Sequence, residues 1–125
     1  MNTWTAVFIG GGLGSLARYL ISIFSFKYLE YTFPWGTFIS NFLACTVLAL
    51  FLIVFSDKLA SQSFWRFLVI TGFCGGFSTF STFSLETYEL LRTHHLGLAA
   101  ANVLVSLGAG LLIMFILMKD VHLPD

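Results

Sequence analysis

Four long runs of apolar residues, separated by short polar connectors, make up most of the chain. They cover residues 4–26, 35–55, 64–88 and 96–118. A helix of about 20 residues crosses the roughly 30 Å hydrocarbon core of a lipid bilayer, and each run is long enough to do so. The first run lacks the basic start and short apolar stretch of a cleavable signal peptide, so we expect it to remain as a helix. The pattern predicts an all-α membrane protein in which residues 1–125 form a single domain of four transmembrane helices.

Composition strengthens this interpretation and excludes several classes of protein. Of the 125 residues, 58% are hydrophobic and 10% are charged, and the mean hydropathy is +0.90, whereas a soluble domain carries about 25% charged residues. Six Lys and Arg balance six Asp and Glu, which leaves no basic surface for nucleic acid. We expect Cys45 and Cys74, inside apolar runs, to be small hydrophobic residues rather than a disulfide or metal pair. No catalytic triad fits four membrane spans and no phosphate-binding loop is present, so we do not expect an enzyme.

Lysine and arginine residues are divided almost evenly between the two sides of the predicted bundle. Orientation follows the excess of Lys and Arg in the short loops, so a chain with almost no bias is expected to insert both ways. The alternative is a fixed orientation, set by features other than the number of Lys and Arg residues on each side. One side holds Lys58, Arg66 and Lys119, and the other holds Lys27, Arg92 and, near the end of its helix, Arg18.

The number of helices bears on where a transport path can run. Four packed helices fill their own centre with side chains, so we expect any path for a solute to lie between subunits. With dual topology, the economical assembly is an antiparallel homodimer whose two-fold axis lies in the membrane plane. Gly10 and Gly14 have the four-residue spacing of small residues at which membrane helices pack closely. This spacing fits packing within one subunit as well as packing between two.

The third run contains a glycine-rich segment followed by hydroxyl residues, Thr-Gly-Phe-Cys-Gly-Gly-Phe-Ser-Thr-Phe-Ser-Thr-Phe-Ser at residues 71–84. Each glycine weakens a helix by about 1 kcal/mol relative to Ala, so we expect a break near Gly75 and Gly76 at mid-membrane depth. Backbone groups freed in hydrocarbon are satisfied by protein, water or an ion, which is why broken helices mark binding sites in transport proteins. The alternative is that the glycines pack closely against a neighbouring helix.

A repeat of Ser, Thr and Phe follows the glycines and predicts one aromatic stripe beside two stripes of hydroxyls. Ring edges carry partial positive charge and hydroxyls donate hydrogen bonds. Because the segment has no Lys or Arg, the combination suits a small anion that is dehydrated without being held tightly. The alternative is that the rings only pack in the core. At helical spacing, Phe80 lies over Phe83, Ser78 lies over Ser81 and Ser84, and Thr79 lies over Thr82.

Three segments of the chain form a combination that is specific to one family. They are the glycine-rich first span ending in Arg18-Tyr19, the Pro-Trp-Gly-Thr-Phe-Ile-Ser-Asn run at residues 34–41, and the segment at residues 71–86. Together they resemble the CrcB/Fluc family of fluoride channels, and the resemblance covers essentially the whole chain. It implies a dual-topology antiparallel homodimer with two fluoride pores and one central sodium ion. It also implies passive export of fluoride from the cytoplasm, across the inner (plasma) membrane of a bacterium, which reduces fluoride toxicity.

The resemblance also implies roles for individual residues. Sodium would be bound by the backbone carbonyls of Gly75 and Ser78 from both subunits. Asn41 would donate its amide to the anion, Glu86 would lie at the pore mouth, and Arg18 would lie near a vestibule. The remaining pore residues would be the rings of Phe80 and Phe83 and the hydroxyls of Ser81, Thr82 and Ser84.

Several of these side chains have a structural interpretation as well. Asn41 lies deep in an uncharged span and fits either pore lining or a hydrogen bond between helices. Arg18 and Glu86 lie toward the same side, where the alternatives are a mutual ion pair or extension to the interface. Asn102 and Ser106 lie one turn apart on the fourth span and either extend the polar path or bond to a neighbouring helix. We assign no role to the histidines of the last connector and the tail, His94, His95 and His122.

Two other functions fit a small four-helix membrane protein. A proton-coupled exporter needs a titratable carboxylate in its first span, whereas residues 4–26 contain Arg18 and no acid. A structural or accessory membrane subunit would use the rings and hydroxyls of the third span for packing only. Rapid release of fluoride from liposomes with little release of chloride supports the channel, and no release supports the accessory subunit.

Overall fold

The structure is a computed structural model that describes residues 2–55 and 64–122, and the secondary structure in these two ranges is helical. Four helical stretches are long and apolar enough to cross a membrane, which confirms the four spans expected from the sequence. Lys58, counted on one side in the comparison of charges, lies outside the described residues. The four stretches are Thr3–Tyr28, Trp35–Phe55, Phe64–Arg92 and Leu96–Met118.

Three of the spans are single helices, and the third consists of several consecutive elements. The single helices are α1 (Thr3–Tyr28), α2 (Trp35–Phe55) and α6 (Leu96–Met118). Asn2 begins α1 as its N-cap, because its side-chain oxygen accepts a hydrogen bond from the Thr5 amide at 2.9 Å. The third span comprises α3 (Phe64–Arg66), the π-helical η2 (Phe67–Cys74), α4 (Gly75–Phe77) and α5 (Phe80–Arg92).

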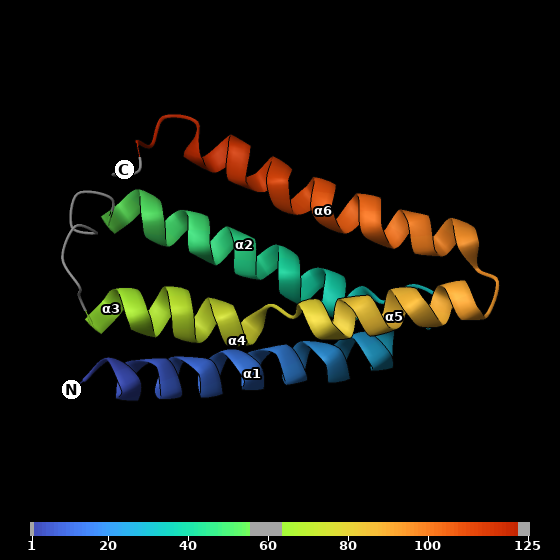
Figure 1. The fold of residues 1–125 in the computed structure, drawn as a ribbon, viewed down its shortest axis with the longest axis horizontal. Coiled ribbons are helices and arrows are strands. Elements are labelled where there is room, and N and C mark those ends of the chain that lie inside the picture. Colours follow the sequence, from blue (N-terminus) through green and yellow to red (C-terminus); the bar gives the residue numbers. More distant parts are fainter. Residues whose placement is uncertain (1, 56–63, 123–125) are drawn as a thin grey trace.

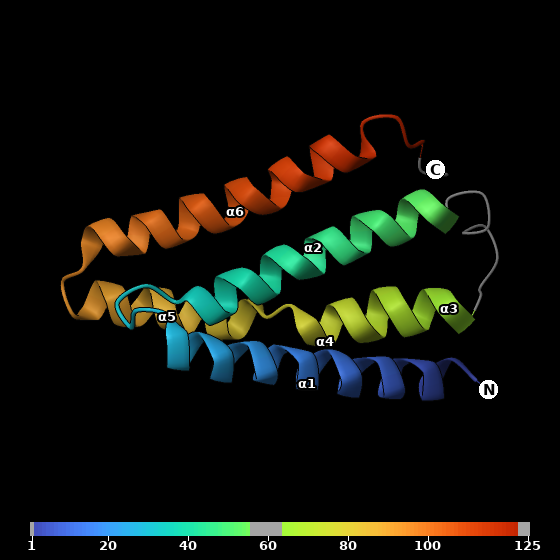
Figure 2. The same cartoon turned by 180° about the vertical axis from the view of Figure 1, so that it is seen from behind.

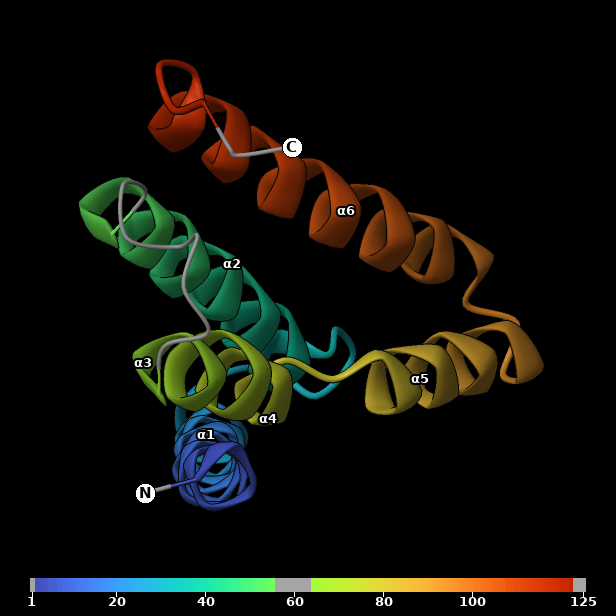
Figure 3. The same ribbon diagram turned by 60° about the vertical axis from the view of Figure 1, so that its left-hand side comes forward.

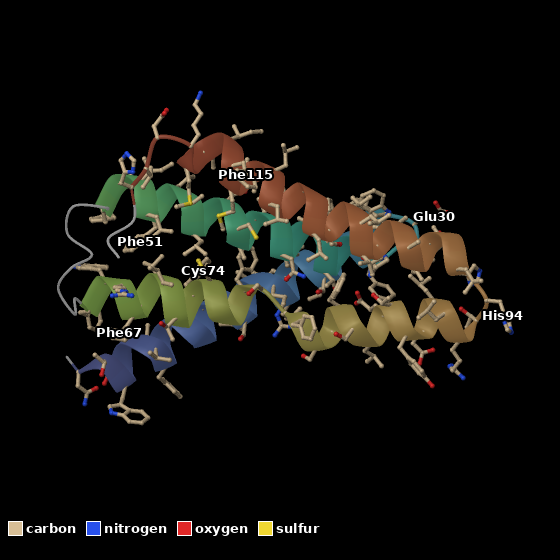
Figure 4. The ribbon with its side chains drawn as sticks, turned by 45° about the horizontal axis from the view of Figure 1, so that its top comes forward. Glu30, Phe51, Phe67, Cys74, His94 and Phe115 are labelled. Carbon is tan, nitrogen blue, oxygen red and sulfur yellow. The ribbon has the colours of Figure 1, made fainter. Side chains whose placement is uncertain are left out.

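The spans alternate in direction and form a bundle with two distinct ends. The start of α1 and the ends of α2 and α6 lie at one end (Figures 1 and 2), whereas the α1–α2 connector and the α5–α6 turn lie at the other. In Figure 4, Phe51 and Phe67 mark the first end, and Glu30 and His94 mark the second. The Cys74 side chain lies between η2 and α2, nearer the first end than the second. The polar residues Glu30 and His94 therefore share one end with the connectors.

Glycines hold α1 against the third span at a separation that larger residues do not allow. A Cβ built on Gly10 would overlap the carbonyl oxygen of Leu68, and one built on Gly14 would overlap that of Phe73. A Cβ built on Gly76 would overlap the backbone of α1 in return. The small-residue spacing of Gly10 and Gly14 is therefore used for packing within one chain.

The helical backbone of the third span is interrupted at Ser78 and Thr79, just after the glycines where the sequence predicts a break. Ser78 has φ −78° and ψ 156°, and Thr79 has φ −150° and ψ 115°, so both are extended. Gly75 and Gly76 themselves remain helical, in α4. The interruption lies after the glycines for a physical reason. Packing against α1 stabilises the helix at Gly76 despite the low helix propensity of glycine.

Beyond the interruption, α5 diverges from the rest of the third span. Figure 3 shows α5 running off to the side of α1 and α4, with α6 returning beside it. Within the described residues, α5 contacts α6 and α2 but not α1, and none of its side chains is buried. The helix that carries the predicted pore residues is therefore weakly fixed by apolar packing.

The core of a single chain is small. Its buried hydrophobic residues are mostly alanines, together with Cys74 and Phe77. Cys45 and Cys74 are both free thiols. Large apolar side chains such as Leu104 and Phe115 on α6 are 72% and 73% exposed, a surface suited to lipid or to another membrane protein.

Candidate functional site

Asn41 of α2 binds the interrupted backbone of the third span. Its Oδ1 atom accepts a hydrogen bond from the Thr79 amide at 2.7 Å, and its Nδ2 atom donates to the Thr79 carbonyl oxygen at 3.4 Å. The side-chain amide thereby satisfies both backbone groups of an extended residue. The structure thus contains the hydrogen bond between helices that was one of the two interpretations of Asn41. Because an amide nitrogen carries two hydrogens, Nδ2 keeps one donor beyond this contact.

The diverted amides deprive two carbonyls of their helical partners. In a continuous helix, the Thr79 amide would donate to the Gly75 carbonyl and the Thr82 amide to the Ser78 carbonyl. Instead, Thr79 donates to Asn41 Oδ1, and Thr82 donates to the Thr79 hydroxyl oxygen at 3.2 Å. Gly75 and Ser78 are the two residues whose carbonyls the sequence resemblance assigns to sodium. Neutral carbonyl oxygens are hard ligands, so their chemistry fits a monovalent cation.

Two other carbonyls near the interruption are already occupied. The Cys74 carbonyl oxygen accepts from the Ser78 amide at 3.0 Å and from the Ser78 hydroxyl at 2.7 Å. The Gly76 carbonyl oxygen accepts from Arg18 Nε at 3.2 Å. Arg18 is half-buried on α1, and its contact with Gly76 replaces the ion pair with Glu86 that the sequence left open.

Glu86 lies beside a cavity between the α1–α2 connector and α5. Its Oε1 atom accepts a hydrogen bond from the Thr37 hydroxyl at 2.8 Å, and its Oε2 atom is buried without a protein partner. The cavity of about 490 Å³ is lined by Ser25, Thr37, Glu30 and Glu86, among others. The hydroxyl of Ser25 is likewise buried and unpaired. Glu86 therefore faces a space at the end of the bundle where Figure 4 labels Glu30.

The two phenylalanines of the predicted pore lie on the first turn of α5. The ring centroids of Phe80 and Phe83 are 6.2 Å apart and their planes are inclined by 38°. Phe80 is 81% exposed, whereas Phe83 is half-buried. Ser81 and Ser84 are exposed on the same helix, and Thr82 is half-buried. The structure thus brings rings and hydroxyls together on one short stretch of α5.

The hydroxyl stripes are shorter than the sequence predicts, because α5 begins only at Phe80. Ser78 and Thr79 are extended, so they do not stack over Ser81 and Thr82 as helical residues would. Thr79 instead acts as the N-cap of α5. For this reason its hydroxyl oxygen accepts a hydrogen bond from the Thr82 amide. The prediction of continuous stripes from Ser78 and Thr79 onward is wrong for this reason.

Two threonines make contacts to which the sequence analysis gave no role. Thr37 lies within the segment at residues 34–41 and donates to Glu86. Thr87 accepts a hydrogen bond from Asn102 Nδ2 at 2.9 Å, and Ser106 donates to Asn102 Oδ1 at 3.2 Å. Of the two interpretations of Asn102, the structure contains the bond to a neighbouring helix. Thr87 lies one turn after Phe83 on α5, and this spacing within one helix does not predict its contact with Asn102 on α6.

Comparison with known proteins identifies the family. Residues 5–118 match the family model described as CrcB-like protein, Camphor Resistance (CrcB). A protein of Flavobacterium psychrophilum named fluoride-specific ion channel FluC is 38% identical over 112 residues, which are 90% of each chain. Fluoride-specific ion channel FluC 1 of Mycolicibacterium paratuberculosis is 42% identical over 94% of this chain and 88% of its own. A protein of Escherichia fergusonii named fluoride-specific ion channel FluC is 44% identical over 82% of this chain and 80% of its own. This chain belongs to the CrcB-like family.

Proposed function

We propose that this chain forms a fluoride-selective ion channel that passively exports fluoride from the cytoplasm. The observation that carries the proposal is the match, over nearly the whole chain, to relatives named fluoride-specific ion channel. The ring edges and hydroxyls gathered on α5 support it, because they offer a small anion hydrogen bonds and weak electrostatic attraction without a fixed positive charge. The four spans make the channel a multi-pass protein, which we place in the inner membrane of a bacterium.

The active unit we propose is an antiparallel homodimer. Phe80 is 81% exposed and the hydroxyls of Ser81 and Ser84 are also exposed on a span that lipid would otherwise surround. Polar groups facing hydrocarbon are costly, so a second copy that covers this part of α5 is favourable. The near-even division of Lys and Arg between the two sides supports opposite insertion of the two copies.

A sodium ion at the centre of this dimer fits the backbone around Ser78. The Gly75 and Ser78 carbonyls lack their helical amide donors, so two copies related by a two-fold axis would supply four such oxygens. When bound, the ion would satisfy these oxygens and add positive charge to the centre of the dimer. Among the described residues, no group of three His, Cys, Asp or Glu side chains offers a competing metal site.

The residues of each chain have distinct parts in moving the anion. The hydroxyls of Ser81, Thr82 and Ser84 donate hydrogen bonds that replace water of hydration. The free hydrogen on Asn41 Nδ2 adds a donor at the interruption, and the edges of Phe80 and Phe83 face the anion there. Because none of these groups is charged, the anion is bound weakly enough to leave.

Release of anions from liposomes tests the proposed function. Full-length protein is reconstituted into liposomes loaded with potassium fluoride, and valinomycin is added so that potassium can balance the charge. We expect rapid release of fluoride and little release of chloride in a parallel preparation. A proton-coupled exporter would require a proton gradient for release, and an accessory subunit would give no release. Either result would overturn the proposal.

A further inference from the structure

A series of side-chain hydrogen bonds connects α6 to the backbone of Phe83. The Ser106 hydroxyl donates to Asn102 Oδ1 at 3.2 Å, and Asn102 Nδ2 donates to the Thr87 hydroxyl oxygen at 2.9 Å. Thr87 in turn donates to the Phe83 carbonyl oxygen at 2.8 Å. The three donors point the same way along the series, so these four residues form one connected network, which we name the α5–α6 relay.

Asn102 is the buried member of the relay. It is 1% exposed and is one of the largest fully buried side chains in the described structure. A buried amide that loses its partner is costly, and more so where water is excluded. By contrast, α5 buries none of its own side chains and does not contact α1 within the described residues. Apolar packing therefore resists rotation of α5 only weakly. Two side-chain hydrogen bonds hold this helix on its neighbours, one from Thr37 of α2 to Glu86 and one from Asn102 of α6 to Thr87, and the second lies one turn from Phe83.

Rotation of α5 decides where its rings point. Thr87 lies one helical turn after Phe83, so the two side chains share a face of the helix. Any rotation that separates Thr87 from Asn102 turns Phe83 by the same angle. Phe80 follows, because it lies on the adjacent turn with its ring centroid 6.2 Å from that of Phe83.

We propose that Asn102 is a positioning residue that sets the rotation of α5 through Thr87 and thereby directs the ring edge of Phe83 toward the fluoride path. The inference rests on the proposed function, since it names what orients the rings on which that function depends. Asn102 itself does not touch the anion. Its contribution is the hydrogen bond that its side-chain amide donates to the Thr87 hydroxyl oxygen, which holds α5 on α6, a helix that also packs on α2.

The flux experiment uses full-length variants in liposomes. Thr87→Val replaces the hydroxyl by a methyl group at similar volume, Asn102→Leu removes the amide, and Thr87→Ser keeps the hydroxyl. We expect Thr87→Val and Asn102→Leu to lower fluoride release at least about tenfold, and Thr87→Ser to stay within about twofold of the parent. Thr46→Val is the matched control, because the Thr46 hydroxyl donates to the Phe42 carbonyl of its own helix at 2.9 Å. We expect it to release fluoride at the parental rate.

A second readout measures ring position without relying on flux. 4-Fluorophenylalanine is placed at position 83, and its ¹⁹F resonance is recorded in lipid nanodiscs. The resonance is expected to shift in Thr87→Val and Asn102→Leu but not in Thr87→Ser or Thr46→Val. If Asn102→Leu fails to assemble, the comparison of Thr87→Val with Thr87→Ser decides alone.

The outcomes separate this inference from the proposed function. A parent protein that releases no fluoride contradicts the proposed function, whereas the ¹⁹F resonance still reports whether the relay positions the ring. A parent that conducts, with Thr87→Val conducting equally well, overturns the positioning role. Lower flux with an unchanged resonance overturns it too, because the relay would then act without moving Phe83.

Discussion

At the scale of single residues, Asn41 decides the local structure of the site. Its side-chain oxygen takes the Thr79 amide away from the helix, and this one contact frees the Gly75 carbonyl. A second diversion, of the Thr82 amide to the Thr79 hydroxyl, frees the Ser78 carbonyl. Two polar side chains thus take up amides that a continuous helix would use.

Substitutions of Asn41 separate its structural part from its part in anion binding. Asn41→Leu removes the acceptor of the Thr79 amide, so we expect the free energy of unfolding to fall by roughly 1–3 kcal/mol and fluoride release to stop. Asn41→Asp keeps an acceptor oxygen for the Thr79 amide but replaces the amide donor by a carboxylate, which is costly in a membrane span and repels an anion, so we expect an assembled but less stable protein with little flux. Unfolding in sodium dodecyl sulfate and liposome flux measure the two effects. Full fluoride release by Asn41→Asp would contradict the donor role.

Replacing the rings tests whether their edges contribute more than bulk. Phe83→Ile and Phe80→Ile keep an apolar side chain but remove the polarised ring edge. We expect the rate of fluoride release to fall at least about tenfold, a change equivalent to ~1.4 kcal/mol. The assembly should still elute from a size-exclusion column at the parental volume. Phe8→Ile is the control, because Phe8 is 82% exposed on α1, which α5 does not contact within the described structure. Undiminished fluoride flux in Phe83→Ile would show that the ring contributes only packing volume.

Several residue contacts were predictable from the sequence, and others were not. The Ser, Thr and Phe repeat predicted the grouping of rings and hydroxyls that α5 displays from Phe80 onward. The partners of Asn41, Arg18 and Glu86 were left open, because each has several acceptors or donors within reach in a helical bundle. Only the three-dimensional arrangement places Arg18 on the Gly76 carbonyl and Glu86 on Thr37.

At the scale of the elements, the tight packing of α1 against η2 and α4 fixes the first half of the third span. The sequence predicted four spans well, because apolar length and polar connectors determine them directly. It predicted the interruption near Gly75 and Gly76, whereas the extended residues are Ser78 and Thr79. Helix propensity favours a break at glycine, whereas close packing of Gly76 on α1 stabilises the helix there.

Glycine substitutions on α1 test this packing. Gly14→Ala places a methyl group into the backbone of the third span, so we expect the free energy of unfolding to drop by about 1–3 kcal/mol. Gly12→Ala on the same helix meets nothing within 4 Å and removes a weak helix former, so we expect it to be neutral or stabilising by up to ~1 kcal/mol. Unfolding curves recorded in detergent compare the free energies of unfolding of the two variants. Equal stability of the two variants would contradict the packing of α1 on the third span.

At the scale of the whole molecule, a single chain leaves much of its candidate site uncovered. Its core is small, α5 is poorly covered, and rings and hydroxyls of the site are exposed. The composition of the chain made a membrane bundle predictable. The proposed antiparallel pairing and the sodium ion are properties of an assembly. They depend on how the surfaces of two copies fit together, which the residue pattern of one chain does not determine.

Removal of sodium tests the proposed ion at the centre of the assembly. Exchange of sodium for N-methyl-D-glucamine on both sides should lower fluoride release slowly, as the ion leaves the freed carbonyls of Gly75 and Ser78. Re-addition of sodium should restore the rate, whereas potassium should do so less well because of its larger radius. Flux that stays constant through prolonged sodium removal would contradict a required sodium site.

The most direct measurement is an experimental structure of the assembled protein in lipid, with sodium and fluoride present. We predict two copies in opposite orientations, with the Gly75 and Ser78 carbonyls of both meeting at the two-fold axis. The edges of Phe80 and Phe83 should face a passage that holds fluoride. Parallel copies, or rings of Phe80 and Phe83 turned toward lipid and away from any passage, would contradict the account.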